Sequence, residues 1–334
     1  MKILCSISTR GRYINYLPMA ISSVLNQTRK PDHLTIYDDN DEPQDLRKTE
    51  VYLQLFKALD AKGIGWDVLY GQKKGQHCNH QTANMSDYDA VWRLDDDCVA
   101  ESDVLEKLEA QMTDDVGAVG GIIRMLNIPF VAPPLEATSL IKDIDHPNRQ
   151  WFAFTATEEV DHLHCSFLYR TKLADYNLRL GKKAHREETM FTYSLRLKGW
   201  KILITPCTTW HFRSVSGGIR SDDNNIEDYQ HDEFLFRKWL QFKQEGKKLY
   251  VLNCGRGDHY MFLQALKPEP DSVIACCYPD IEGFQGYNLI SIADAMNLVD
   301  IESYNIYAWC ARKGWKGTII EAFKEFYENI GCTR

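Results

Sequence analysis

The sequence contains no long hydrophobic run. No stretch of its 334 residues reaches the roughly 18 apolar residues that a membrane-spanning helix requires, so we expect no integral membrane segment. The apolar stretch from Met1 to Ile7 ends before Arg10 and is too short for a secretory signal. The ten cysteines include no CxxC pair and no zinc-finger spacing, which favours reduced thiols. Together these absences predict a cytoplasmic protein.

An excess of basic charge is also missing. The formal net charge is −8 at pH 7, which disfavours broad electrostatic binding to nucleic acid or anionic lipid. Basic residues do outnumber acids between Arg170 and Lys201. This stretch could face an anionic substrate, or it could be the solvated face of a helix.

Strand and helix patterns alternate along the first half of the chain. Such an order predicts an α/β fold with a doubly wound, mostly parallel sheet. Apolar runs indicate strands over residues 2–8, 33–37, 66–70, 90–94 and 116–123, and helical spacing indicates helices over residues 13–26, 51–59, 76–85 and 105–112.

The second half predicts further parts. A proline-containing loop over residues 124–150 is long enough to suggest a function. A helix over residues 188–198 is capped by Gly199. We expect a catalytic domain over residues 1–215, a polar loop and helical linker over 216–248, and a small α/β unit over 249–334. Within that unit we expect strands at 249–253 and 272–276, helices at 308–311 and 319–326, and a glycine-containing turn at 254–258 that suits an anion.

Three consecutive acids, Asp95, Asp96 and Asp97, directly follow the apolar run at residues 90–94. They therefore lie at the carboxyl end of a buried strand, where open α/β sheets bind ligands. Three adjacent carboxylates repel one another unless solvent or a cation neutralises them. Oxygen ligands of this kind suit Mg²⁺ or Mn²⁺ beside a substrate phosphate. A solvated acidic turn is the alternative.

Four motifs occur in a characteristic order. They are Ile7-Ser8-Thr9-Arg10-Gly11-Arg12, a helix ending Leu-Asn-Gln-Thr before a strand ending Asp38-Asp39-Asn40, the acid triplet, and Arg186-Glu187-Glu188-Thr189 followed by a helix. Over residues 3–212 this order resembles the family 2 glycosyltransferases of the GT-A fold. The resemblance implies transfer of a sugar from a nucleotide-sugar, with a UDP-sugar favoured, to a hydroxyl acceptor.

The resemblance assigns nucleotide contacts to several residues. Asp39 would accept from the ring N–H of a uracil-like base, with Asp38 as its neighbour, and Thr9 and Arg10 would approach the nucleotide. Separately from the resemblance, Lys73 and Lys74 lie in the loop after the third predicted strand and could contact the diphosphate, although a plain surface role is as good an interpretation. Asp38 and Asp39 could instead form an Asx turn that closes the strand.

Within the triplet, the resemblance makes Asp97 the ligand of a divalent cation that bridges the diphosphate. Asp95 and Asp96 would face the ribose or the waters of the cation, and Asp95 is a further candidate ligand. His211 would be a second protein ligand, and an imidazole favours Mn²⁺ over Mg²⁺. A histidine buried between aromatic residues is the alternative for His211.

Glu187 and Glu188 match the acid pair of which the second member is the general base in the family. Glu188 would remove the acceptor's hydroxyl proton in a single, inverting displacement. Glutamate replaces the family's aspartate here, which lengthens the arm. Alternatively, both acids are favoured simply because they occupy the first turn of a helix.

Other functions stay open at this point. A nucleotidylyltransferase also has acids at the end of a strand. A non-catalytic nucleotide-sugar-binding protein is a further alternative. The acceptor could be a saccharide of a glycan, a protein side chain or a hydroxylated base in DNA. The basic stretch between Arg170 and Lys201 is the feature that favours DNA. The sequence does not fix the oligomeric state.

Overall fold

The computed structural model describes residues 1–71, 73–125, 137–212, 226–245, 248–253, 273–280, 288–296 and 305–310. The chain forms two compact units, Met1–Glu233 and Phe234–Arg334. The division into a catalytic domain, a linker and an accessory domain stays a prediction.

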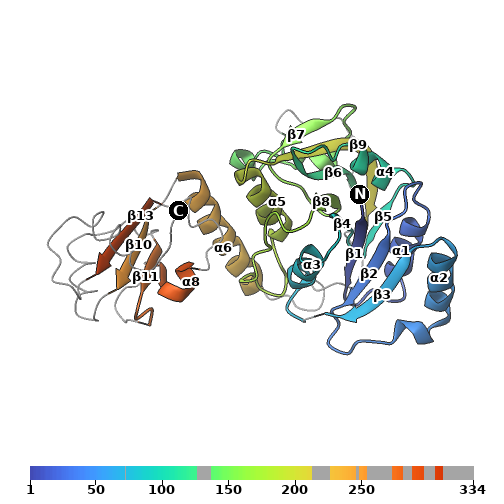
Figure 1. Cartoon of the computed structure of the whole chain (residues 1–334), viewed down its shortest axis with the longest axis horizontal. Coiled ribbons are helices and arrows are strands. Elements are labelled where there is room, and N and C mark those ends of the chain that lie inside the picture. Colours follow the sequence, from blue (N-terminus) through green and yellow to red (C-terminus); the bar gives the residue numbers. More distant parts are fainter. Residues whose placement is uncertain are drawn as a thin grey trace. The chain divides into compact units, whose positions relative to one another are not determined.

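The first unit is built on one mixed sheet (Figure 1). Its strand order is β3-β2-β1-β4-β8-β6-β9-β5, and β7 pairs with β9 outside that path. Strands β3, β2, β1 and β4 are parallel, β8 is antiparallel to both of its neighbours, and β6 is parallel to β9. The expected α/β fold is confirmed. The bounds are β1 Ile3–Thr9, β2 His33–Asp38, β3 Gly65–Tyr70, β4 Ala90–Arg93, β5 Cys98–Ala100, β6 Val116–Met125, β7 Glu158–Val160, β8 Phe167–Arg170 and β9 Lys201–His211.

Helices cover both faces of this sheet. Ile3 and Ile7 of β1 belong to one apolar cluster, together with residues of α1, α2 and α4. Leu4 points to the opposite face and joins a second cluster with residues of α3 and α5. This alternation is the period of a strand buried on both sides. The helices are α1 Leu17–Leu25, α2 Glu50–Ala61, α3 Gln76–Asn84, α4 Val104–Ala110 and α5 Glu187–Leu197, with 3-10 turns η1 Leu46–Lys48, η2 Ile141–Asp143 and η3 Arg149–Trp151.

Helix α1 begins later than its spacing predicts. The expected start was Tyr13, but the helix starts at Leu17 and has Pro18 in its first turn. Proline lacks an N–H donor and is tolerated at that place, not further inside a helix. The four residues before Leu17 therefore form a turn that precedes the helix.

The second unit contains a four-stranded parallel sheet in the order β12-β11-β10-β13. The strands are β10 Lys248–Asn253, β11 Val273–Cys276, β12 Asn288–Ser291 and β13 Asn305–Cys310, with the short helix α8 at Ile292–Met296. Helix α6, Ile226–Glu245, contains the boundary between the two units.

The helix expected at 308–311 is wrong, because residues 308–310 belong to β13 and pair with β10. A run of four apolar residues does not distinguish a helix from a strand, and the β-forming Ile306 and Tyr307 precede it. The turn at 254–258, the helix at 319–326 and the polar segment at 216–225 lie outside the described residues. Within the described part of the chain, no helix is long and apolar enough to span a membrane.

Candidate functional site

The motif residues gather at the carboxyl ends of three parallel strands, β1, β2 and β4. Thr9 pairs with Asp38 across β1 and β2, and the N–H of Asp39 donates to the carbonyl of Thr9 at 2.9 Å. The acid triplet connects β4 to β5. Because β5 pairs antiparallel with β9, Cys98 lies opposite His211. The topology therefore brings His211 to the triplet from more than a hundred residues away.

The triplet is not a solvated acidic turn. Asp96 and Asp97 are each 4% exposed, and two arginines pair with the three acids. Arg12 pairs with Asp96 and also lies 2.9 Å from Asp97. Arg93 Nη2 lies 3.1 Å from Asp95 Oδ1. Carboxylates are buried in folded proteins only when partners such as these arginines compensate their charge.

The three carboxyls differ in their electrostatic surroundings. Burial raises the pKa of Asp95 to about 7 and that of Asp96 to about 6. Burial also acts on Asp97, but the hydrogen bond and charge of His211, followed by the charge of Arg12, outweigh it and lower its pKa. Asp97 therefore stays ionised at neutral pH, as a cation ligand must.

Asp97 and His211 form the centre of a possible cation site. His211 Nε2 lies 3.4 Å from Asp97 Oδ2. Ligand atoms of Asp95, Asp97, Cys98 and His211 all lie within 4.8 Å of one another. Carboxylate oxygens with one imidazole fit Mn²⁺ or Mg²⁺. The thiol of Cys98 was not expected from the sequence.

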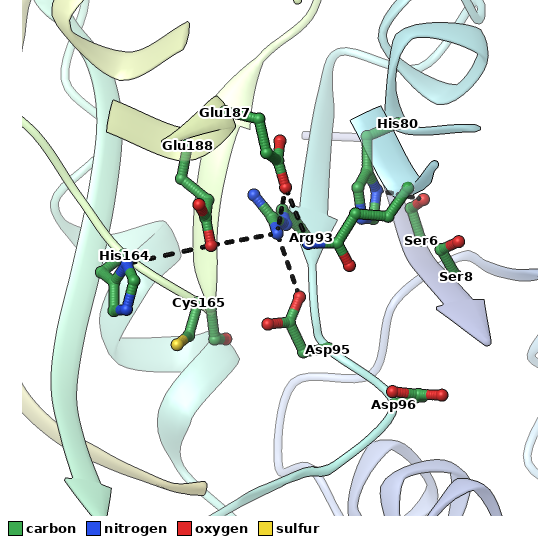
Figure 2. Close-up of polar contacts among 12 residues, drawn as sticks. Ser6, Ser8, His80, Arg93, Asp95, Asp96, His164, Cys165, Glu187 and Glu188 are labelled. Atoms are coloured by element: carbon green, nitrogen blue, oxygen red, sulfur yellow. Dashed lines mark hydrogen bonds and ion pairs between the residues drawn. The ribbon is translucent and has the colours of Figure 1, made fainter. Parts of the chain in front are cut away.

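Arg93 joins the triplet to the acid pair of α5 (Figure 2). Its buried Nη2 lies 2.7 Å from Glu187, 3.3 Å from Glu188 and 3.1 Å from Asp95. Sequence reasoning missed this arginine. The signal was present, because an arginine within the apolar run 90–94 is buried only when acids pair with it.

The two glutamates have different surroundings. Glu187 is fully buried, accepts from Gln76 Nε2 at 2.8 Å, and has a pKa raised well above its usual range by burial. Glu188 Oε1 lies 3.8 Å from Nδ1 of His164, whose side chain is 29% exposed. Glu187 therefore belongs to a buried ion pair, whereas Glu188 lies beside a side chain that solvent reaches.

The loop before α5 is held by the first turns of α6. The buried carboxylate of Asp232 accepts from the N–H of Gly181 at 2.7 Å and from that of His185 at 2.9 Å. Arg186, which has a left-handed backbone with φ of 66°, pairs with Glu233 at 3.1 Å. These contacts fix where α5 begins and hence where Glu188 lies.

Asp39 and Asp38 have separate partners at the end of β2. Asp39 Oδ1 accepts from the N–H of Lys73 at 2.8 Å, and Asp38 accepts from the hydroxyl of Tyr13 and from Asn40 Nδ2 at 2.8 Å. Asp38 thus closes the turn that follows β2. The Asx-turn interpretation applies to Asp38, and Asp39 remains the candidate for base recognition.

The other predicted nucleotide contacts border this turn. Arg10 donates from Nη1 to the carbonyl of Asp39 at 2.8 Å and from its backbone N–H to Asp96 at 3.3 Å. Thr9 is buried beneath it, whereas Lys74 is exposed. A cavity of about 500 Å³, lined by Arg10 and Asn40 among others, opens between loops 10–15 and 40–44. Its volume is in the range of small-molecule sites.

Several lysines and arginines between Arg170 and Lys201 have polar partners within the first unit. Lys172 pairs with Asp87, Lys201 with Asp115, and Arg196 with Glu159 and Asp161, whereas Arg170 donates to the carbonyls of Met112 and Val116. These contacts weaken the case for a surface that binds DNA phosphates.

Comparison with known proteins identifies the group to which this site belongs. Residues 6–173, half of the chain, match the family model described as Glycosyl transferase family 2. No curated protein matches the chain by sequence.

Solved structures with the same fold include S. aureus TarS 1-349 in complex with UDP-GlcNAc (TM-score 0.51, 14% identity, 72% of this chain and 67% of that one). They also include GalNAc-T7 with UDP, GalNAc and Mn²⁺ (TM-score 0.52, 14% identity, 74% of this chain and 51% of that one). The chain spans only 39% of the longer S. aureus TarS structure. At these identities the likeness establishes the fold alone, and it confirms the expected GT-A architecture.

Proposed function

Because the chain belongs to glycosyl transferase family 2, we propose that it is a metal-dependent transferase that moves a sugar from a nucleotide-sugar to a hydroxyl acceptor. The observation that carries this proposal is the convergence of Asp97, His211 and Glu188 at one edge of the sheet. A nucleotidylyltransferase reaction would assign no role to the buried Glu187 and Glu188 that pair with Arg93.

A UDP-sugar is the donor we favour. Asp39, held by the N–H of Lys73, is the candidate acceptor for the ring N–H of uracil. The structures of similar fold that contain UDP or UDP-GlcNAc support this choice by analogy. Arg10 and Thr9 border the same turn and would contact the nucleotide, while the exposed Lys74 is free to reach the diphosphate.

Asp97 and His211 would hold a divalent cation, with Asp95 as a further ligand. Their oxygen and nitrogen atoms fit Mn²⁺, and Mg²⁺ less well because of the imidazole. When bound, such a cation supplies Lewis-acid stabilisation of the charge on the departing nucleoside diphosphate. Arg12 pairs with Asp96 and Asp97 and would help to orient these carboxylates.

Glu188 is the proposed general base. It would take the hydroxyl proton while the acceptor oxygen bonds to the anomeric carbon and the bond from that carbon to the diphosphate oxygen breaks. Attack from the face opposite the leaving group inverts the anomeric configuration. Arg93 holds the carboxylate of Glu188, and the buried Glu187 helps to balance the charge of Arg93.

The acceptor is a saccharide or another hydroxyl compound in this proposal. A hydroxylated base in DNA is the alternative, and the salt dependence of acceptor binding separates the two. Affinity for DNA would fall steeply as salt rises because bound phosphates release counterions. Affinity for a neutral saccharide would change little.

A thermal-shift screen of nucleotide-sugars with and without Mn²⁺ tests the proposal. A UDP-sugar at a hundred times its dissociation constant should stabilise the chain by about 2.7 kcal/mol. The Mn²⁺-dependent part of the shift, and metal-stimulated turnover, should be lost in Asp97→Ala. If no nucleotide-sugar stabilises the chain with or without Mn²⁺, or if Asp97→Ala keeps its full metal response, the proposed site is wrong.

A further inference from the structure

A second group of potential metal ligands lies next to the proposed cation site and shares no residue with it. His164, Cys165 and Glu188 offer a nitrogen, a sulfur and an oxygen whose positions all lie within 4.8 Å of one another. The distance from His164 Nδ1 to Glu188 Oε1 is 3.8 Å, and Figure 2 shows Cys165 beside this pair. Each ligand comes from a different chemical class.

The backbone holds the thiol in this position. Cys165 is a non-glycine residue in the left-handed region, with φ of 55°. Its buried sulfur lies 3.6 Å from His211 Nδ1, at the border of the two groups. Trp151 packs against the ring of His164, with their centroids 6.1 Å apart. The partial exposure of His164 gives an ion a route from solvent.

The ligand chemistry selects the kind of cation. A thiolate with an imidazole and a carboxylate matches the preferences of Zn²⁺, whereas Mg²⁺ and Mn²⁺ prefer oxygen ligands. Three protein ligands leave a fourth tetrahedral position for water. We propose that His164, Cys165 and Glu188 form a Zn²⁺ site that is separate from the Asp97–His211 site. Zinc binding there releases the thiol proton of Cys165 to solvent.

This site has a consequence for catalysis that rests on the proposed function. Glu188 is the proposed base, so a zinc ion that uses its carboxylate prevents it from accepting a proton. Zinc therefore inhibits transfer without displacing the nucleotide-sugar or the cation at Asp97. Zinc binding itself does not depend on the function.

Cobalt spectroscopy on the reduced 334-residue chain tests the binding directly. Co²⁺ bound to a thiolate produces a near-ultraviolet charge-transfer band, and Zn²⁺ should displace it. The band should be lost in Cys165→Ser and strongly weakened in His164→Gln. It should persist in Cys98→Ser, which alters the other group, and in the control Cys78→Ser. Cys78 also contacts an imidazole, that of His77 at 3.4 Å, but is in no three-ligand group of the described residues.

Several outcomes would overturn the proposal. These are the absence of the band in the wild-type chain, its persistence in Cys165→Ser, or its loss in Cys98→Ser. Circular dichroism of each variant checks folding, and the part-exposed His164 supplies a variant with little risk to the core. If Cys165→Ser does not fold, the His164→Gln titration decides.

Inhibition is measured separately, at saturating Mn²⁺ and UDP-sugar. His164→Gln should raise the zinc concentration for half-inhibition about tenfold or more, because removing a direct ligand should cost at least as much as removing a residue that only supports one. Equal inhibition of the wild type and His164→Gln would refute the inhibitory consequence. If no sample transfers sugar, the proposed function fails while the cobalt titration still tests the zinc site.

Discussion

Replacing Arg93 with methionine removes the buried cation that Glu187, Glu188 and Asp95 share. Its Nη2 lies 2.7, 3.1 and 3.3 Å from Glu187, Asp95 and Glu188. At an effective dielectric constant of about 20, each contact corresponds to about 5–6 kcal/mol of Coulomb attraction before desolvation. Desolvation of the arginine cancels much of this. Removal of one partner of a buried pair costs about 3–5 kcal/mol because the other charge is left uncompensated, and we expect about 4 kcal/mol here.

The loss should depend on pH in a defined direction. Burial already raises the pKa of Glu187, and removing Arg93 raises it further. The folded state of the variant then binds more protons than the unfolded state above the ordinary glutamate pKa, so its stability falls as pH rises. Arg93→Met should therefore lose less stability at about pH 5 than at about pH 8.

Urea unfolding of the full chain, followed by tryptophan fluorescence, measures the effect. Adding Glu187→Gln to Arg93→Met should recover about 2 kcal/mol, because one buried charge is removed and the two sites are coupled. Arg47→Met is the matched control, since Arg47 pairs with Asp45 at 2.8 Å but on the surface. Its midpoint should not change. A loss below about 1 kcal/mol in Arg93→Met, or no coupling to Glu187, would refute the reasoning.

Three further predictions follow from the site and its supports. Glu188→Gln should bind nucleotide-sugar normally in a thermal-shift assay but lose transfer by about 10²–10⁴-fold, and unchanged transfer would exclude it as the base. Burial lowers the pKa of His77 from 6.5 to about 4. The unfolded state therefore binds more protons between those values, so stability should fall by about 3 kcal/mol as pH drops through this window, and His77→Gln should flatten that part of the pH profile. Gly75→Ala should cost about 1–3 kcal/mol, because φ is +112° and a Cβ would lie 2.6 Å from the carbonyl oxygen of Lys182. Gly63→Ala, with φ of +70° and nothing within 4 Å, should cost less, and equal losses in thermal unfolding would contradict the steric argument.

Strands β1, β2, β3, β4 and β6 of the first unit were predictable because their signals are local, whereas the three-residue strands β5 and β7 were not predicted. An apolar run such as Ala90–Arg93 and a helix closed by Gly199 carry their patterns within a few residues. The roles of Asp97 and Glu188 rest on the family order of the motifs and stay predictions. The start of α1 and the strand β13 were missed because single prolines and short apolar runs fit more than one structure.

The missed parts of the site all depend on contacts between distant residues. Arg93 pairs with Glu187, which lies 94 positions further along the sequence. Cys98 lies opposite His211 only because β5 pairs with β9. Cys165 lies close to His164 and Glu188, and its backbone is left-handed. A cysteine in the sequence does not predict this conformation. Strand register and such turns are set by the packing of the whole unit, so a linear pattern does not contain them.

The contacts of Asp232 determine how short a working catalytic chain can be. This carboxylate accepts the N–H groups of Gly181 and His185, in the loop that leads into α5. A chain ended at residue 215, where the sequence alone suggests a domain boundary, would leave both N–H groups without their acceptor. Each loss costs about 1–3 kcal/mol when the group stays buried. The shortest fragment that keeps Glu188 in position therefore extends through Glu233, and the first turns of α6 belong to the same compact unit as the candidate site.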